Sequence, residues 1–197
     1  MKRVAFLALV VLALPMAVWA DDINVLNQLG GVSLSTSGIM STNSPMTGYN
    51  GLTAPGGGGS LGYVTFGTGA LLSGSVNGGG TFSATGSWFD IFSRSKYGQP
   101  SGSIFTGAFV GPISWTLTSA PGKPNLTFIL SGEIEGQLYT GHEVTGTTSQ
   151  YIYANGSGAG IKFGHTSFAS TPEPGTLGLL GTGVLGMVGM IRRRKSF

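Results

Sequence analysis

The sequence predicts a mainly β protein, built as an antiparallel β-sandwich or a barrel-like domain. Between residues 61 and 170, short segments rich in β-branched and aromatic residues are separated by turn signals about every 8–15 residues. Several of these segments alternate apolar and polar residues with a period of two, as half-buried strands do. The body of the chain carries no convincing helical period, so we expect helices only at the two ends.

The region ahead of residue 61 lacks this order. Residues 21–34 predict an ambiguous first element, either a strand or a short helix. Residues 35–60 show no period and end in Pro55 and four glycines, a composition typical of a long loop. We therefore assign residues 21–60 to this first element and a Gly/Ser/Pro-rich lead-in loop, and residues 61–170 to an exported β-rich domain.

Seven or eight strands are expected in that domain. The turn at 77–80 separates two apolar segments and indicates a hairpin. The clearest alternation is in residues 125–139, where one parity is apolar and predicted to face the core: Leu126, Phe128, Leu130, Ile134 and Leu138. The expected strands are residues 61–66, 70–76, 81–92, 103–110, 113–119, 125–139, 145–154 and 159–169.

The ionisable residues of the body do not form a recognisable catalytic or metal site. Glu133 and Glu135 are expected as solvent-side neighbours about 7 Å apart, and a glycosidase would need such a pair across a cleft. A solvated strand face explains them better. His142 and His165 are 23 residues apart, without the three or four convergent ligands of a zinc site. We therefore predict a non-enzymatic body with no catalytic residues, no metal and no cofactor.

Aromatic residues are frequent in the body and allow two interpretations. Most aromatic side chains fill a core, whereas exposed rings can stack on sugars and make a carbohydrate-binding module. The sequence leaves both open. The set consists of Trp88, Phe89, Phe92, Tyr97, Phe105, Phe109, Trp115, Tyr139, Tyr151 and Tyr153.

The N-terminus has the three parts of a secretory signal peptide. Lys2 and Arg3 form a basic region, an apolar stretch of 11 residues follows, and Pro15 ends it. Small residues then precede a cleavage site predicted between Ala20 and Asp21. Residues 1–20 are accordingly expected to form a signal helix that directs the chain to the general secretion machinery.

The charge of the chain comes largely from its ends. The whole sequence carries +3, but six of its ten cations lie in the two terminal segments, and residues 21–170 have four cations and six anions. No basic patch remains for nucleic acid, so we expect no nucleic-acid partner. The chain has no cysteine, which excludes disulfides and thiolate metal sites.

The C-terminal segment, residues 171–197, combines three features in series. Pro172, Glu173 and Pro174 come first, followed by 17 uncharged residues at 175–191 and then a basic tail at 192–197. A helix of that length covers about 25 Å, enough to insert in a locally thinned bilayer. The basic cluster predicts that the tail stays cytoplasmic and that everything before residue 175 lies outside. The cluster is Arg192, Arg193, Arg194 and Lys195.

This order of motif, apolar span and basic cluster resembles the PEP-CTERM sorting signal of bacterial exported proteins. The segment is sometimes also catalogued as an ice-binding protein C-terminal domain, a label that carries no implication of ice binding here. The resemblance implies that an exosortase, a membrane-embedded processing enzyme, recognises Pro172–Pro174 and cleaves nearby. The chain is then a substrate, and catalytic residues belong to the exosortase.

Together these observations predict an exported, non-enzymatic protein of the cell surface or extracellular matrix. The resemblance implies that its C-terminal transmembrane helix anchors it in the inner membrane until processing moves it to the surface or outside. The alternative is a carbohydrate-binding or exopolysaccharide-binding β-sandwich on the same anchor. Expected partners are the exosortase, the secretion machinery and the membrane, with exopolysaccharide as a further candidate.

Overall fold

The computed structural model describes residues 23–170 except 57, 95–96 and 120–124, all within a unit that spans Asp21–Ser170. The predicted signal helix and its cleavage site, the predicted transmembrane helix, the sorting motif and the basic cluster lie outside the described residues. Among the described residues there is no helix that could serve as a membrane span.

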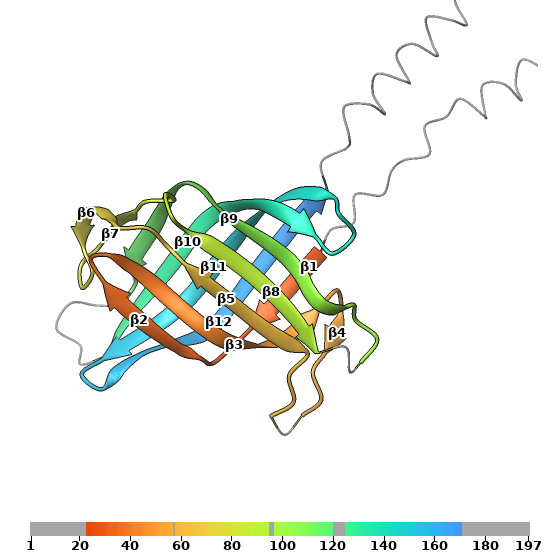
Figure 1. The fold of residues 1–197 in the computed structure, drawn as a ribbon. Helices are drawn as coiled ribbons and strands as arrows, with labels where there is room; N and C mark the ends of the chain where they lie inside the picture. The colour runs from red at the N-terminus through yellow and green to blue at the C-terminus, as the bar shows by residue number, and fades with distance from the viewer. Residues whose placement is uncertain (1–22, 57, 95–96, 120–124, 171–197) are drawn as a thin grey trace, which may run out of the picture. The chain divides into compact units, whose positions relative to one another are not determined.

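Twelve strands make up the regular structure of these residues (Figure 1). Long strands dominate the second half of the chain, where β9 to β12 have 13 to 17 residues each. The strands are β1 (Ile23–Asn27), β2 (Gly31–Ser35), β3 (Gly38–Tyr49), β4 (Leu52–Thr53), β5 (Gly62–Gly67), β6 (Leu71–Ser75), β7 (Gly79–Phe82), β8 (Trp88–Arg94), β9 (Ser101–Leu117), β10 (Leu126–Leu138), β11 (Glu143–Asn155) and β12 (Gly158–Ser170).

Eight of these strands close into an antiparallel barrel. Their order is β10-β11-β12-β1-β3-β5-β8-β9, and β9 pairs back with β10 to complete the ring. The mainly β, antiparallel prediction is confirmed, and of the two architectures the barrel is right and the sandwich is wrong. Each of the eight strands pairs with a neighbour on both sides, and the described residues contain no second sheet that could pack against the first, as a sandwich requires.

The prediction of a lead-in loop over residues 35–60 is wrong for residues 38–49. They form β3, which pairs with β1 on one side and β5 on the other and is part of the barrel wall. A β-bulge between Ser41 and Ser44 shifts the inward parity, and Asn43 there has a φ of 56°. The inward positions on either side of the bulge are serines, so neither hydrophobicity nor period revealed the strand.

Two predicted strand boundaries are also corrected. Residues 81–92 divide into β7 and β8, separated by a turn in which the Ser87 amide donates to the Ala84 carbonyl. Conversely, residues 103–110 and 113–117 belong to the single strand β9, because Gly111 and Pro112 are absorbed in a bulge opposite Gly132, and residues 118–119 follow the end of that strand. Proline is tolerated inside a sheet at such a bulge, where its missing amide hydrogen leaves no ladder bond open.

The faces predicted for residues 125–139 are confirmed. Phe128, Leu130 and Ile134 are fully buried, and the glycines that interrupt their series serve the packing of the barrel interior. A Cβ on Gly132 would lie 2.8 Å from the Phe109 ring, and one on Gly136 would lie 2.9 Å from the Phe105 ring. The absence of these side chains lets two large rings enter the interior from β9.

Candidate functional site

The barrel interior contains a hydrogen-bonded cluster of polar side chains beside its aromatic core. Asn27 on β1 and Gln150 on β11 are both buried and face each other through their amides. The Asn27 Nδ2 donates to Gln150 Oε1 at 2.9 Å, and the Gln150 Nε2 donates to Asn27 Oδ1 at 3.3 Å. Such buried amides are stable only when they satisfy one another, as these do.

Hydroxyl groups extend this cluster in both directions. Asn27 Nδ2 also donates to Ser44 Oγ at 2.8 Å, and the Ser44 hydroxyl donates to the Leu29 carbonyl at 2.7 Å. On the other side, Gln150 Nε2 donates to Thr148 Oγ1, which shares a 2.9 Å hydrogen bond with Thr166. We call Asn27, Ser44, Thr148, Gln150 and Thr166 the interior network. It occupies interior volume that a ligand would otherwise need.

The two amides meet across a glycine. In the ladder, Gly164 of β12 is the register partner of Asn27 on one side and of Gln150 on the other. A Cβ at this position would overlap both Gln150 Oε1 and Asn27 Oδ1. Side chains from the strands on either side of β12 can therefore close over its backbone only because residue 164 has no side chain.

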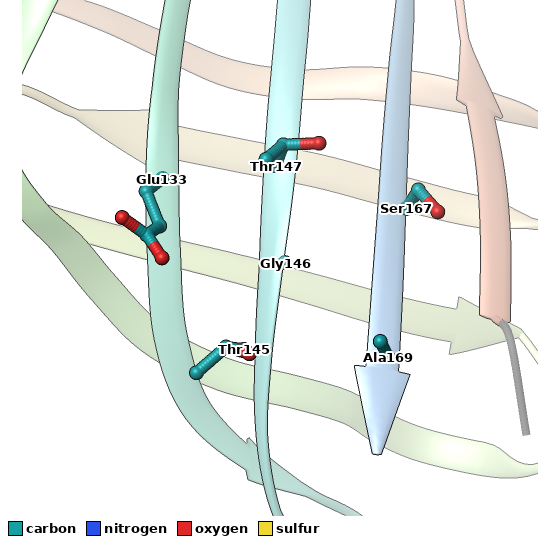
Figure 2. A pocket seen from close by; sticks show the side chains of 6 residues that line it. All are labelled: Glu133, Thr145, Gly146, Thr147, Ser167 and Ala169. Carbon is teal, nitrogen blue, oxygen red and sulfur yellow. The ribbon is translucent and has the colours of Figure 1, made fainter. Parts of the chain in front are cut away.

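The outer surface has a shallow depression of about 230 Å³ over β10, β11 and β12 (Figure 2). Hydroxyl and small side chains line it, and Glu133 is its only ionisable residue. One exposed carboxylate without a second acid or base in the lining offers no acid–base pair for catalysis. The lining residues are Glu133, Thr145, Gly146, Thr147, Ser167 and Ala169.

The two glutamates and the two histidines that the sequence offered as candidates do not converge on one site. Glu133 and Glu135 are exposed on the outer face of β10, opposite Thr147 and Thr145 of β11, as the solvated-face interpretation predicts. His142 is exposed in the turn after β10, and His165 on β12 has its Nε2 3.3 Å from Asn24 Oδ1. No three His, Asp or Glu residues converge on a metal position in the described ranges.

The fold changes the protonation of Asp90. It lies on β8 between Thr65 and Thr106, and partial burial raises the pKa of its carboxyl above the usual 3.8, while the hydrogen bond with Thr106 opposes that rise. A raised pKa in the folded state means that folding disfavours the ionised form. The resulting loss of stability develops as the pH rises through 3.8 and the folded pKa, and it persists at neutral pH.

Replacing Asp90 with asparagine should therefore leave the barrel as stable at pH 7, or more stable, because asparagine keeps the polar contact without the desolvated charge. The advantage should disappear below about pH 3, where Asp90 itself is protonated. Urea unfolding at the two pH values measures the difference. Glu133→Gln, at an exposed carboxylate, serves as the matched control, and a lower stability of D90N at pH 7 would contradict this assignment.

The aromatic residues separate into a core set and a surface set. Phe89, Phe105, Phe109 and Trp115 are buried, which fits the core interpretation, whereas Trp88 is half-buried. The exposed members are Phe92, Tyr97, Tyr139 and Tyr153. The aromatic set is thus divided between the barrel interior and the outer surface.

One surface cluster combines the exposed rings of Tyr153 and Phe163 with the half-buried ring of Tyr151, and it includes residues that the sequence did not single out. Phe163 on β12 stacks on Tyr151 of β11 with ring centroids 4.0 Å apart, and Tyr153 follows two residues along β11. Lys162 is exposed beside Phe163. We call Tyr151, Tyr153, Lys162 and Phe163 the Lys162 patch. No sequence signal marked Lys162 or Phe163, because the bulge that exposes both side chains is not visible in the period of residues 159–169.

Comparison with known proteins identifies the segment after the barrel. Residues 170–195 match the model of the PEP-CTERM protein-sorting motif. No curated protein and no solved structure matches the chain. The match covers the Pro-Glu-Pro motif, the apolar span and most of the basic tail. The chain therefore carries a PEP-CTERM protein-sorting motif, the mark of an exported protein that an exosortase processes at the membrane.

Proposed function

We propose that this chain is a non-enzymatic protein of the cell surface or extracellular matrix, whose working part is the outer surface of the barrel. The observation that carries this proposal is the filled interior. Aromatic rings and the interior network occupy the space inside the wall, and the network satisfies its own amides. The chemistry available to a partner is then that of exposed side chains.

In this proposal, the sorting motif determines how the protein reaches the cell surface. The signal peptide directs the chain to the general secretory machinery and is cut between Ala20 and Asp21 during export. The apolar span at 175–191 holds the protein in the inner membrane with Arg192–Lys195 on the cytoplasmic side. Cleavage near Pro172–Pro174 then releases the barrel to the surface or the medium.

Replacing Pro172, Glu173 and Pro174 together with alanine should block this processing. Proline breaks helices whereas alanine favours them, so the substitution removes the helix-breaking residues that mark the motif. The variant should remain in the membrane fraction with its C-terminal segment attached, as intact mass would show. Thr171→Ala, next to the motif, is the control. Processing of the triple variant at the wild-type rate would refute the route.

A second candidate function is carbohydrate or exopolysaccharide binding by the same barrel. The exposed aromatic side chains favour it, in particular Tyr153 and Phe163, which are 43% and 44% exposed on neighbouring strands. Large rings are usually buried, and a cluster of exposed ones marks an interaction surface. Binding of the full-length protein to soluble polysaccharides tests this function.

A further inference from the structure

The Lys162 patch is formed by a β-bulge. Along the β11–β12 ladder, Tyr151 pairs with Phe163 but Ile152 pairs with Ile161, so Lys162 is an extra residue on β12. Ile161 and Gly164 are buried, whereas Lys162 and Phe163 between them are both exposed. The bulge thus places two consecutive side chains, a cation and an aromatic ring, on the same outer surface, which an ordinary strand would put on opposite faces.

Tyr153 adds a ring that lies on the backbone. A Cβ on Gly160, its partner in the ladder, would be 2.6 Å from the Tyr153 hydroxyl and 2.8 Å from its Cζ. The ring therefore extends over Gly160 in contact with the strand. Since Tyr153 is 43% exposed, its other side is open to solvent. Tyr151 and Phe163 stand beside it as a stacked pair with an interplanar angle of 20°.

The charge at the patch is locally positive, although residues 21–170 as a whole have more anions than cations. The acidic pair of β10 lies on the same outer surface but farther along the strands. Glu133 is level with Thr147 and Ser167 in the ladders, five residues from Lys162 along β12. That separation is about 16 Å, twice the screening length of about 8 Å at physiological salt. Among the residues that the structure describes, the ammonium group of Lys162 is therefore the charge that a ligand meets at this patch.

We propose that the Lys162 patch binds an acidic polysaccharide, with sugar rings against Tyr153 and Phe163 and a sugar carboxylate at the Lys162 ammonium. The negative faces of aromatic rings attract the partly positive C–H groups of a sugar ring. The cation selects a charged sugar over a neutral one. This inference rests on the second candidate function and assigns it a site and a ligand class.

The size of the patch favours a polysaccharide over a folded protein as its occupant. Stable protein interfaces bury about 800 Å² on each partner and involve about 20–30 residues. The Lys162 patch has four residues, and its neighbours on β10 and β11 include Thr127 and Ser149, whose hydroxyls suit a hydrated ligand. A narrow row of rings and hydroxyls matches the width of a single sugar chain.

The barrel provides a matched control surface on other strands. Phe92 on β8 is 52% exposed, and Arg94 lies over the Tyr63 ring at 4.5 Å from its centroid. This second surface also combines an exposed aromatic ring, Phe92, with a cation, but that cation already lies over the Tyr63 ring. Phe92→Ala and Arg94→Gln therefore remove the same kinds of group as Phe163→Ala and Lys162→Gln.

The test measures binding of the full-length protein in detergent to polygalacturonate and to dextran, an acidic and a neutral polymer, by affinity electrophoresis at low and high salt. We expect retardation by polygalacturonate, at least 10-fold weaker binding for Tyr153→Ala combined with Phe163→Ala, and about 3- to 5-fold weaker binding for Lys162→Gln. Lys162→Arg, Phe92→Ala and Arg94→Gln should bind like the wild type. Thermal unfolding of each variant confirms that the barrel is folded.

Three results would overturn the proposal, and they are distinguishable. Binding that survives the Lys162 patch variants but is lost with Phe92→Ala or Arg94→Gln would place the site elsewhere and leave polysaccharide binding standing. Equal retardation by dextran, unaffected by Lys162→Gln, would contradict the acidic ligand. No retardation by either polymer would remove the site and the second candidate function together, without touching the sorting route.

Discussion

Replacing Gly164 with alanine is expected to lower the free energy of unfolding by about 2–4 kcal/mol, because the new methyl group meets a buried, fully bonded amide pair. The Cβ would overlap Gln150 Oε1 and Asn27 Oδ1. Either amide can move away only by giving up its hydrogen bonds inside the barrel. A buried amide left without a partner then adds its own desolvation cost to the strain of overpacking.

Gly31→Ala is the matched control for this substitution. Gly31 is also a strand glycine, on β2, but a Cβ there would have nothing within 4 Å. Its replacement should change the free energy of unfolding by no more than about 0.5 kcal/mol. Urea unfolding of the two variants gives the comparison. If Gly164→Ala were as stable as Gly31→Ala, the amides would not be packed over β12 as described.

Replacing Trp115 with alanine should cost about 3–5 kcal/mol, the range for removing a fully packed large ring. Trp115 lies on β9 where the strand is flanked by both β7 and β10. Its ring stacks on Phe128 at 4.3 Å, meets Phe82 edge to face at 6.5 Å, and donates its Nε1 hydrogen to the Val76 carbonyl at 2.8 Å. The loss would affect the attachment of the β6–β7 hairpin as well as the core.

Trp115→Phe separates packing from hydrogen bonding. The phenyl ring retains much of the stacking on Phe128 but cannot donate to the Val76 carbonyl. We expect an intermediate loss of stability, together with faster amide hydrogen exchange in β6 and β7 than in β10. Equal losses for the alanine and phenylalanine variants would show that the indole hydrogen bond, rather than ring burial, dominates at this position.

The sequence alone was enough to predict those strands in which apolar and polar residues alternate regularly. In β10, the apolar parity from Phe128 to Leu138 and the exposed Glu133 and Glu135 are where the period of two places them. Glycines on the inward parity were compatible with that pattern, since they make room for rings from β9. Local composition and burial agree in this strand, so a local pattern could identify it.

The parts that could not be predicted depend on contacts between distant residues. The residue pattern of β3 predicts a loop, because the bulge in this strand shifts the parity and Ser41 and Ser44 occupy inward positions. A serine is stable at the inward position 44 because Asn27, from another strand, donates a hydrogen bond to the Ser44 hydroxyl. The pairing of β1 with β12, which helps to close the barrel, also depends on the register between strands. The same is true of the Lys162 patch, which a bulge creates. Local composition does not reveal that register.

The most direct test of the central claim is the intact mass of the protein recovered from the cell surface and medium, wild type beside the triple alanine variant. We expect a wild-type chain that begins at Asp21, keeps the barrel through residue 170 and ends near Pro172–Pro174. The variant should instead retain residues 175–197 in the membrane fraction. A wild-type protein found outside the membrane with residues 175–197 still attached would contradict the account.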